Sequence, residues 1–288
     1  MQIPGLKQSD IKWLHVELST RCNAWCPACG RNNLGFGLVD HLVEEDLNFD
    51  TLQQTLKKLP NLHTIQLCGN YGDPVIAKNI TEVIELCKKF CKKIQIHTNG
   101  SLRNAEWWHY MAEQLKNIEH DVWFGIDGLS DTHHLYRQGT DFDKIINNAT
   151  SFINNGGNAV WQFIPYQHNE HQIKDCIRLS QQLGFKKFKM ATLHRTTTIV
   201  KHYKSGIAYT LSPPGSVSKL LKTLNNEQNT STKIDDCMHY AYPSIYLGAN
   251  GKFSTCCYQH KKTFDTIEEL FYNRQDLTNI ICIKNCGI

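Results

Sequence analysis

Three cysteines stand close together near the start of the chain. Cys22, Cys26 and Cys29 follow a C-x3-C-x2-C spacing. Thiolates suit iron–sulfur clusters, and three of them can bind three corners of a 4Fe-4S cluster while the fourth iron stays open. An open coordination position is typical of a reactive metal centre. A zinc site with a distant fourth ligand is the alternative, and a disulfide is disfavoured for a chain expected in a reducing compartment.

A second group of cysteines lies near the end of the sequence. Its members are Cys237, Cys256, Cys257, Cys282 and Cys286. Four thiolates can hold either a 4Fe-4S cluster or a structural zinc ion, so the residue types leave both open. Within this group, residues 245–257 have the pattern of a β-hairpin that turns at an Asn-Gly pair.

The composition argues against several classes of function. The 288 residues carry a net charge of +4, and 20% of them are charged. This charge is too mild to indicate nucleic-acid binding, and no block rich in Lys and Arg stands out. We recognise neither an apolar run long enough to span a membrane nor a secretory leader, and we therefore expect a cytoplasmic protein.

The elements that must position these cysteines alternate between strands and helices. Short apolar or β-branched runs predict six strands, at residues 13–18, 64–67, 94–97, 122–126, 160–165 and 187–191. Amphipathic runs predict helices at residues 49–59, 80–91, 105–115, 143–153 and 171–183. This alternation is typical of a parallel α/β sheet, in which ligands bind at the carboxyl ends of the strands.

The C-x3-C-x2-C motif after the first strand of an α/β domain resembles the signature of the radical S-adenosylmethionine (SAM) superfamily. The resemblance covers about residues 13–192, with further matches near the end. It implies a partial (β/α)6 radical SAM barrel in which Cys22, Cys26 and Cys29 bind a 4Fe-4S cluster. The amino and carboxylate groups of SAM would chelate the open iron. An external one-electron reductant, similar to flavodoxin or ferredoxin, would drive cleavage of SAM to a 5′-deoxyadenosyl radical that abstracts a substrate hydrogen atom.

Two turn segments resemble parts of the family's SAM site. Residues 69–74, Gly-Asn-Tyr-Gly-Asp-Pro, are similar to its Gly-Gly-Glu-Pro segment, which implies that Gly72 and Asp73 receive the SAM amino group. Glycine permits close backbone approach, and a carboxylate pairs with an ammonium group. Residues 98–100 resemble its Thr-Asn-Gly segment, which implies that Asn99 reaches the cofactor.

Further matches follow the later strands. Residues 125–128 resemble a Ser-Ile-Asp-Gly segment, with Gly125 where serine is frequent, and imply that Asp127 binds ribose or orients the substrate. Arg137 resembles an arginine that pairs with the SAM carboxylate, a task suited to a bidentate guanidinium. Gln162 and Met190 would line the ribose and adenine side.

The G-x4-C spacing from Gly251 to Cys256 resembles the auxiliary-cluster region of SPASM and twitch domains. It implies that Cys237, Cys256, Cys282 and Cys286 hold a second 4Fe-4S cluster. The resulting domain prediction is a core at residues 1–195, a linker or cover at 196–234 and a small β-hairpin, cysteine-rich auxiliary domain at 235–288. An auxiliary cluster favours an oxidoreductase that modifies a peptide or a small molecule.

Two other functions stay open from the sequence. A non-enzymatic zinc-binding interaction module would explain the clustered cysteines. A radical SAM enzyme that modifies RNA is the other alternative, although nucleic acid is not indicated by the charge.

Overall fold

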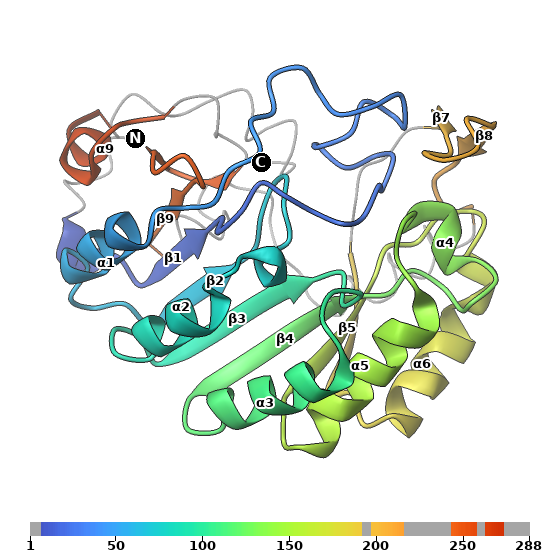
Figure 1. The fold of residues 1–288 in the computed structure, drawn as a ribbon, viewed down its shortest axis with the longest axis horizontal. Helices are drawn as coiled ribbons and strands as arrows, with labels where there is room; N and C mark the ends of the chain where they lie inside the picture. The colour runs from blue at the N-terminus through green and yellow to red at the C-terminus, as the bar shows by residue number, and fades with distance from the viewer. Residues whose placement is uncertain (1–6, 192–196, 216–242, 258–262, 274–288) are drawn as a thin grey trace. The chain divides into compact units, whose positions relative to one another are not determined.

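The computed structural model describes residues 7–191, 197–215, 243–257 and 263–273. The chain divides into two compact units. Unit 1 comprises Met1–Thr20, Glu44–Gln95 and Thr230–Ile288, and unit 2 comprises Arg21–Val43 and Ile96–Asn229. The strands follow the order β10-β9-β1-β2-β3-β4-β5-β6, and β3 (Lys93–Thr98) supplies residues to both units (Figure 1).

Unit 1 is built around a parallel pairing between the two ends of the sequence. Strand β1 (Trp13–Val16) pairs in parallel with β2 (Thr64–Leu67) on one side and with β9 (Ser244–Leu247) on the other. Strand β10 (Phe253–Ser254) is antiparallel to β9. All four residues of β9 are buried, so this strand belongs to the interior of unit 1. The helices of unit 1 are α1 (Phe49–Lys57), α2 (Ile80–Cys87), α9 (Ile267–Asn273) and the 3-10 turns Gln8–Asp10 and Pro74–Ile76.

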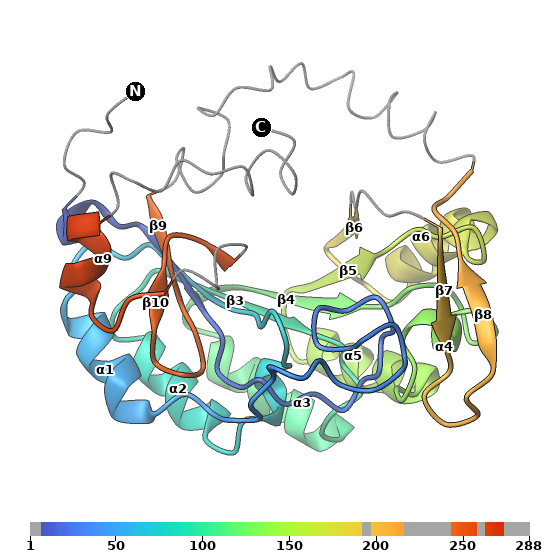
Figure 2. The same ribbon diagram turned by 90° about the horizontal axis from the view of Figure 1, so that it is seen from above.

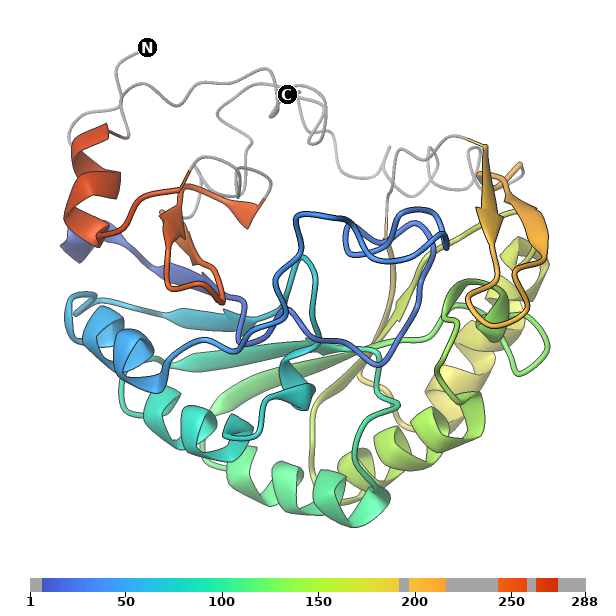
Figure 3. The ribbon, with the colours of Figure 1, turned by 45° about the horizontal axis from the view of Figure 1, so that its top comes forward.

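Unit 2 continues the alternation of strands and helices. Strands β4 (Glu119–Gly125), β5 (Ala159–Phe163) and β6 (Lys187–Met190) pair in parallel. Its helices are α3 (Ala105–Leu115), α4 (His133–Tyr136), α5 (Phe142–Asn154), α6 (Ile173–Gln182) and the 3-10 turn Glu170–Gln172. Helices α3, α5 and α6 lie along one face of these strands (Figure 3). A separate hairpin pairs β7 (Thr198–Lys201) with β8 (Ala208–Leu211).

Aromatic side chains fill the space between the helices and strands of unit 2. The ring of Trp108 on α3 lies 5.0 Å from Phe124 of β4 and 5.9 Å from Phe152 of α5, and all three side chains are buried. Burial of rings this large removes much apolar surface from water and contributes a large share of the stability of the core.

Polar side chains define where two of these helices begin. Asn104 accepts a hydrogen bond from the backbone of Trp107 at the start of α3, and Asp141 does the same for Lys144 at the start of α5. Such N-caps satisfy backbone donors that have no partner inside the helix.

The predicted fold class is confirmed, because each of the six predicted strands overlaps an observed strand and β9–β10 forms the expected hairpin. The helix predicted to reach Cys91 ends at Cys87, after which Phe90 and Cys91 turn back to the carbonyl of Cys87. The hairpin β7–β8 was not predicted and lies in the stretch expected to be a linker or cover. The predicted domain boundaries stay a prediction.

Among the described residues, no helix has the length and apolar character needed to cross a membrane.

Candidate functional site

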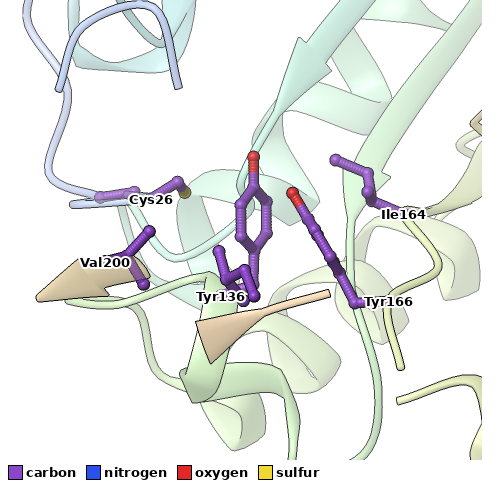
Figure 4. Packing of buried hydrophobic residues seen from close by; sticks show 7 residues of the cluster. Cys26, Tyr136, Ile164, Tyr166 and Val200 are labelled. Carbon is purple, nitrogen blue, oxygen red and sulfur yellow. The ribbon is translucent and has the colours of Figure 1, made fainter. Parts of the chain in front are cut away.

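The three cysteines of the first motif pack against one apolar cluster in unit 2. Cys26 is a buried member of this cluster, with an exposed fraction of 6%. The other members are Ala24, Tyr136, Ile164, Tyr166, Val200 and Leu211, and Cys22, Ala28 and Cys29 pack against them. Figure 4 shows the sulfur of Cys26 pointing toward Tyr136, whose ring faces Tyr166 at 4.9 Å. The loop therefore carries its sulfurs on a largely apolar surface.

Nitrogen donors reach two of the sulfurs. The backbone N–H of Ala24 donates to Cys22 Sγ at 3.4 Å, and Asn99 Nδ2 donates to the same sulfur at 3.7 Å. The side chain of Arg137 donates to Cys26. Burial raises the pKa of Cys26 to about 12, and the charge of Arg137 opposes that rise. A buried sulfur is stable as a thiolate only when positive charge or hydrogen-bond donors compensate its negative charge. The iron ions of a bound cluster would provide such positive charge.

Backbone turns hold the cysteine loop in its shape. The N–H of Cys29 donates to the carbonyl of Cys26 at 3.1 Å, and the N–H of Asn32 donates to the carbonyl of Cys29 at 3.0 Å. The side chain of Asn32 also donates to the carbonyl of Cys26 at 2.8 Å. The N–H of Trp25 donates to the carbonyl of Gln138 at 2.7 Å, so the segment after α4 anchors the middle of the loop.

A buried ion pair lies behind Cys26. Arg137 Nε is 2.6 Å from Asp127 Oδ2, and the other oxygen of Asp127 accepts the N–H of Ile164 at 2.6 Å. The structure therefore uses both carboxylate oxygens of Asp127 to hold Arg137 and the chain after β5. It also brings Asn99 and Arg137 to the cysteine loop. Contact of either residue with SAM stays a prediction.

Gly125 leaves the space that the guanidinium occupies. A Cβ on Gly125 would lie 2.6 Å from Arg137 Nη2 and 2.8 Å from its Cζ. The absence of the serine that is frequent at this point of the family motif therefore has a steric reason in this chain. Any side chain here would press against Arg137 while that residue is held by Asp127.

His133 supports the same ion pair and is neutral. Its Nδ1 accepts the backbone N–H of Asp127 at 3.1 Å, and its Nε2 is 3.0 Å from Thr140 Oγ1. Burial, with the nearby charge of Arg137, lowers the pKa of His133 to about 3. An added proton would remove the acceptor that Asp127 uses, which explains why the neutral form is favoured.

Gln162 lies on β5, and Met190 lies on the neighbouring strand β6. Gln162 pairs with Gly125 of β4, and Met190 pairs with Phe163 of β5. Both side chains are partly exposed. Their predicted place beside ribose and adenine stays a prediction.

Gly72 and Asp73 belong to unit 1, where the N–H of Gly72 meets an acid that the sequence analysis missed. Glu17 follows β1 and is 2% exposed. Its carboxylate accepts the N–H groups of Tyr71 at 2.7 Å and Gly72 at 3.2 Å, and it accepts the hydroxyl of Tyr246 at 2.5 Å. Burial raises the pKa of Glu17, although these hydrogen bonds oppose the rise.

Asp73 has a local structural task in the same turn. It is buried, and its carboxylate accepts the N–H of Val75 at 3.0 Å, which caps the 3-10 turn that follows. A Cβ on Gly69 would lie 2.6 Å from the Gly72 carbonyl oxygen and 2.7 Å from Glu17 Oε1, so this position requires glycine. The receiving of a SAM amino group by Gly72 and Asp73 stays a prediction.

The second cysteine group is described only in part. Cys256 is 7% exposed, and its carbonyl accepts the hydroxyl of Ser254 at 2.9 Å. Cys237, Cys282 and Cys286 lie outside the described residues. Within the part of the chain that the structure describes, no three Cys, His, Asp or Glu side chains are arranged to hold one metal ion. In a 4Fe-4S cluster each thiolate binds a different iron, so its ligands need not converge on a single point.

Comparison with known proteins adds to this picture. No protein-family model matches the chain. The 7,8-dihydro-6-hydroxymethylpterin dimethyltransferase of Methanocaldococcus jannaschii is 26% identical over 152 residues, which is 51% of this chain and 29% of that protein. The matched segment thus spans less than a third of this curated relative.

Two solved structures share the fold. Streptococcus suis SuiB bound to S-adenosylmethionine has a TM-score of 0.62 at 15% identity, over 94% of this chain and 67% of that one. Histidine-tagged anSMEcpe with bound AdoMet has a TM-score of 0.64 at 15% identity, over 93% of this chain and 78% of that one. Both neighbours are radical SAM enzymes. The resemblance seen in the cysteine motif is therefore confirmed for the fold, and the chain has the fold of the radical SAM superfamily.

Proposed function

We propose that the chain is a radical SAM enzyme in which Cys22, Cys26 and Cys29 hold a 4Fe-4S cluster. The observation that carries the proposal is the cysteine loop itself. Its three cysteines pack against one apolar cluster, and nitrogen donors reach two of the sulfurs. Thiolates, an apolar wall and N–H donors are the surroundings that such a cluster requires.

When bound, the cluster would supply the electron that cleaves SAM into methionine and a 5′-deoxyadenosyl radical, which takes a hydrogen atom from a substrate carbon. The residues of this chain bind and orient the reactants. The backbone of the loop fixes the sulfurs, and Asn99 holds the strand end beside Cys22. Asp127 holds Arg137 by its Nε, which leaves the terminal nitrogens of Arg137 for Cys26 and for the carboxylate of SAM.

A peptide is the substrate class that the comparisons favour. One crystal structure of SuiB is described as bound to the precursor peptide SuiA, and anSMEcpe has been crystallised with AdoMet and a peptide. These statements concern those proteins, and they support a peptide here ahead of a small molecule. We further propose that Cys237, Cys256, Cys282 and Cys286 hold a second 4Fe-4S cluster that accepts an electron during an oxidative modification.

The experiment is metal analysis followed by a SAM-cleavage assay. After anaerobic reconstitution, we expect about eight irons and eight sulfides per chain, and about four of each if only the first cluster forms. With dithionite as the reductant, the reconstituted chain should release 5′-deoxyadenosine from SAM. Replacement of Cys22, Cys26 or Cys29 by alanine should abolish that release and remove about four irons.

Cys176 provides the matched control for these substitutions. It is buried on α6, and its replacement by alanine should leave both iron and 5′-deoxyadenosine unchanged. Zinc without iron in the purified and reconstituted chain would refute the proposal and favour the zinc-binding interaction module. Iron with no cleavage of SAM would refute the enzymatic part alone.

A further inference from the structure

The hairpin β7–β8 has one covered face and one open face. Val200 and Leu211 are buried in the same apolar cluster as Cys26. Successive residues of a strand point to opposite faces, and Ile199 accordingly is 65% exposed. The two strands form a sheet of their own, seen side by side in Figure 2. A two-stranded sheet is marginally stable alone, so the hairpin depends on its packing against this apolar cluster.

The segment that follows Cys29 is joined to this hairpin. The N–H of Lys201 donates to the carbonyl of Leu34 at 2.9 Å, and Lys201 Nζ lies 4.4 Å from the centre of the Phe36 ring. A Cβ on Gly35 would clash with the carbonyl of Lys201, so the two backbones are in close contact. The loop and the hairpin thus present one continuous surface.

An aromatic stack connects this surface to the cysteine motif. The rings of Trp25 and Tyr203 lie 5.6 Å apart and are nearly parallel, with an angle of 9° between them. Trp25 directly precedes Cys26, and Tyr203 follows β7. The N–H of Tyr203 also donates to Gln138 Oε1 at 2.8 Å, which fixes the position of this ring. The stack therefore leads from the hairpin to the residue beside a cluster ligand.

The surface combines exposed apolar side chains with positive charge. We call it the hairpin face and define it by Leu34, Phe36, Ile199, Lys201, Lys204 and Ile207. The exposed fractions of its apolar side chains run from 36% to 67%. Residues 31–39 and 198–211 contain no Asp or Glu. Exposed apolar groups among charges of one sign are typical of a protein-docking surface, and the sign here complements an acidic partner.

We propose that the hairpin face docks a small acidic one-electron carrier protein, of the flavodoxin or ferredoxin type, beside the Trp25–Tyr203 stack. The inference rests on the proposed function, since it assigns where the electron for that reaction enters. One electron would leave the reduced cofactor of the carrier, which would be oxidised, and would reduce the cluster that Cys22, Cys26 and Cys29 are proposed to hold. No bond forms or breaks in this step.

The test compares a protein reductant with a small one. The variant is Lys201→Glu/Lys204→Glu, and the control is Lys144→Glu/Lys174→Glu, which makes the same charge change at exposed positions on α5 and α6. Each reconstituted protein is mixed anaerobically with a reduced acidic flavodoxin or with dithionite, and cluster bleaching is followed by stopped flow. Binding of the oxidised flavodoxin is measured separately by interferometry.

We expect the hairpin variant to lose at least about tenfold in both the flavodoxin rate constant and the binding affinity at low salt. In about 1 M salt, where charges are screened within about 3 Å, the loss should shrink to less than about threefold. Iron content, the dithionite rate and dithionite-driven cleavage of SAM should match those of the unaltered protein.

Three results would overturn the proposal. One is a hairpin variant whose flavodoxin rate stays within about twofold of the unaltered protein. Another is an equal loss in the control variant, which would show an effect of net charge alone. The third is an equal loss with dithionite, which would place the defect in the cluster. Failure of the unaltered, reconstituted protein to be reduced by dithionite would instead overturn the proposed function, and this inference with it.

Discussion

The close fit between Gly125 and Arg137 makes Gly125→Ala an informative substitution. The new Cβ would lie 2.6 Å from Arg137 Nη2, a distance at which the atoms repel one another. The guanidinium is not free to move aside, because its Nε is 2.6 Å from Asp127 and the Asp127 side chain is completely buried. Alanine should therefore strain or break the ion pair.

The size of the effect follows from the burial of that pair. Removing one partner from a buried ion pair costs about 3–5 kcal/mol, because a charge is left without compensation. A displaced guanidinium keeps part of its attraction for Asp127. We therefore expect Gly125→Ala to lower the free energy of unfolding by about 2–3 kcal/mol, and the larger Gly125→Ser to lower it at least as much.

Urea unfolding of the metal-free protein, followed by circular dichroism, measures this change. Gly215→Ala is the matched control, because the nearest heavy atom to its new Cβ is Glu170 Oε1 at 3.6 Å, an ordinary contact. It should change the free energy of unfolding by less than about 0.5 kcal/mol. In an Arg137→Met background the clash is absent, so Gly125→Ala should cost less than about 1 kcal/mol. A cost that is the same in both backgrounds would refute the steric argument.

Three further predictions concern the buried groups of the two units. Burial raises the pKa of Glu17 in the folded state. The contribution of Glu17 to the free energy of unfolding is therefore present below its unfolded pKa and is lost as the pH rises through its folded pKa. Glu17→Gln should therefore flatten the fall in unfolding free energy above about pH 4.5, and parallel curves for the two proteins would contradict this. The pKa of His133 is lowered to about 3 in the folded state. Its contribution to the free energy of unfolding is therefore present above about pH 6.5 and is lost as the pH falls toward 3. Between about pH 6.5 and pH 5 the unaltered protein should lose about 2 kcal/mol more than His133→Gln, and an equal loss in urea titrations would show that the histidine is not neutral. Tyr203→Leu removes the stack on Trp25 and should cost about 1 kcal/mol, whereas Tyr272→Leu, at a side chain 88% exposed, should cost almost nothing in the same assay.

Much of the α/β scaffold was predictable from the sequence because its signals are local. The run Thr64–Leu67 is a strand in the structure with the predicted bounds, and helix α3 has the predicted bounds 105–115. Asn104 explains the start of that helix, since an N-cap is a property of a few neighbouring residues. Periodicity and caps require no knowledge of distant contacts.

The missed features depend on partners far away in the sequence. Glu17 is visible as an acid after the first strand, yet its partner Tyr246 is 229 residues away, and only the fold brings the two together. For Asp127, a role in binding ribose or orienting the substrate stays a prediction, and the sequence did not indicate that its carboxylate also holds Arg137 and the N–H of Ile164. Side-chain pairing of this kind is not encoded by the motif that contains the residue.

The hairpin β7–β8 could have been found from the sequence. Residues 198–201 are rich in β-branched side chains, a Ser-Gly pair follows at Ser205 and Gly206, and residues 208–211 contain the strand-favouring Tyr209 and Thr210. The polar stretch in which it lies concealed this pattern. The sequence does not show that the buried face of this hairpin packs on the cysteine loop. That contact joins Val200 to Cys26, two residues that lie far apart in the sequence.

The pairing of β1 with β9 has a consequence for the order in which the chain folds. Trp13 pairs with Ser244, and Val16 pairs with Leu247, so one edge of β1 has no partner until residues near 247 have been synthesised. Pairing of such distant segments is slow, because the chain loses the entropy of a very long loop before any favourable contact forms. During translation β1 would thus remain an open strand edge while residues 96–211 emerge and assemble their own strands and helices. A nascent chain stalled before β9 should be readily digested at β1 and protected within β4 and β5, and one extended past β10 should become protected at β1 as well.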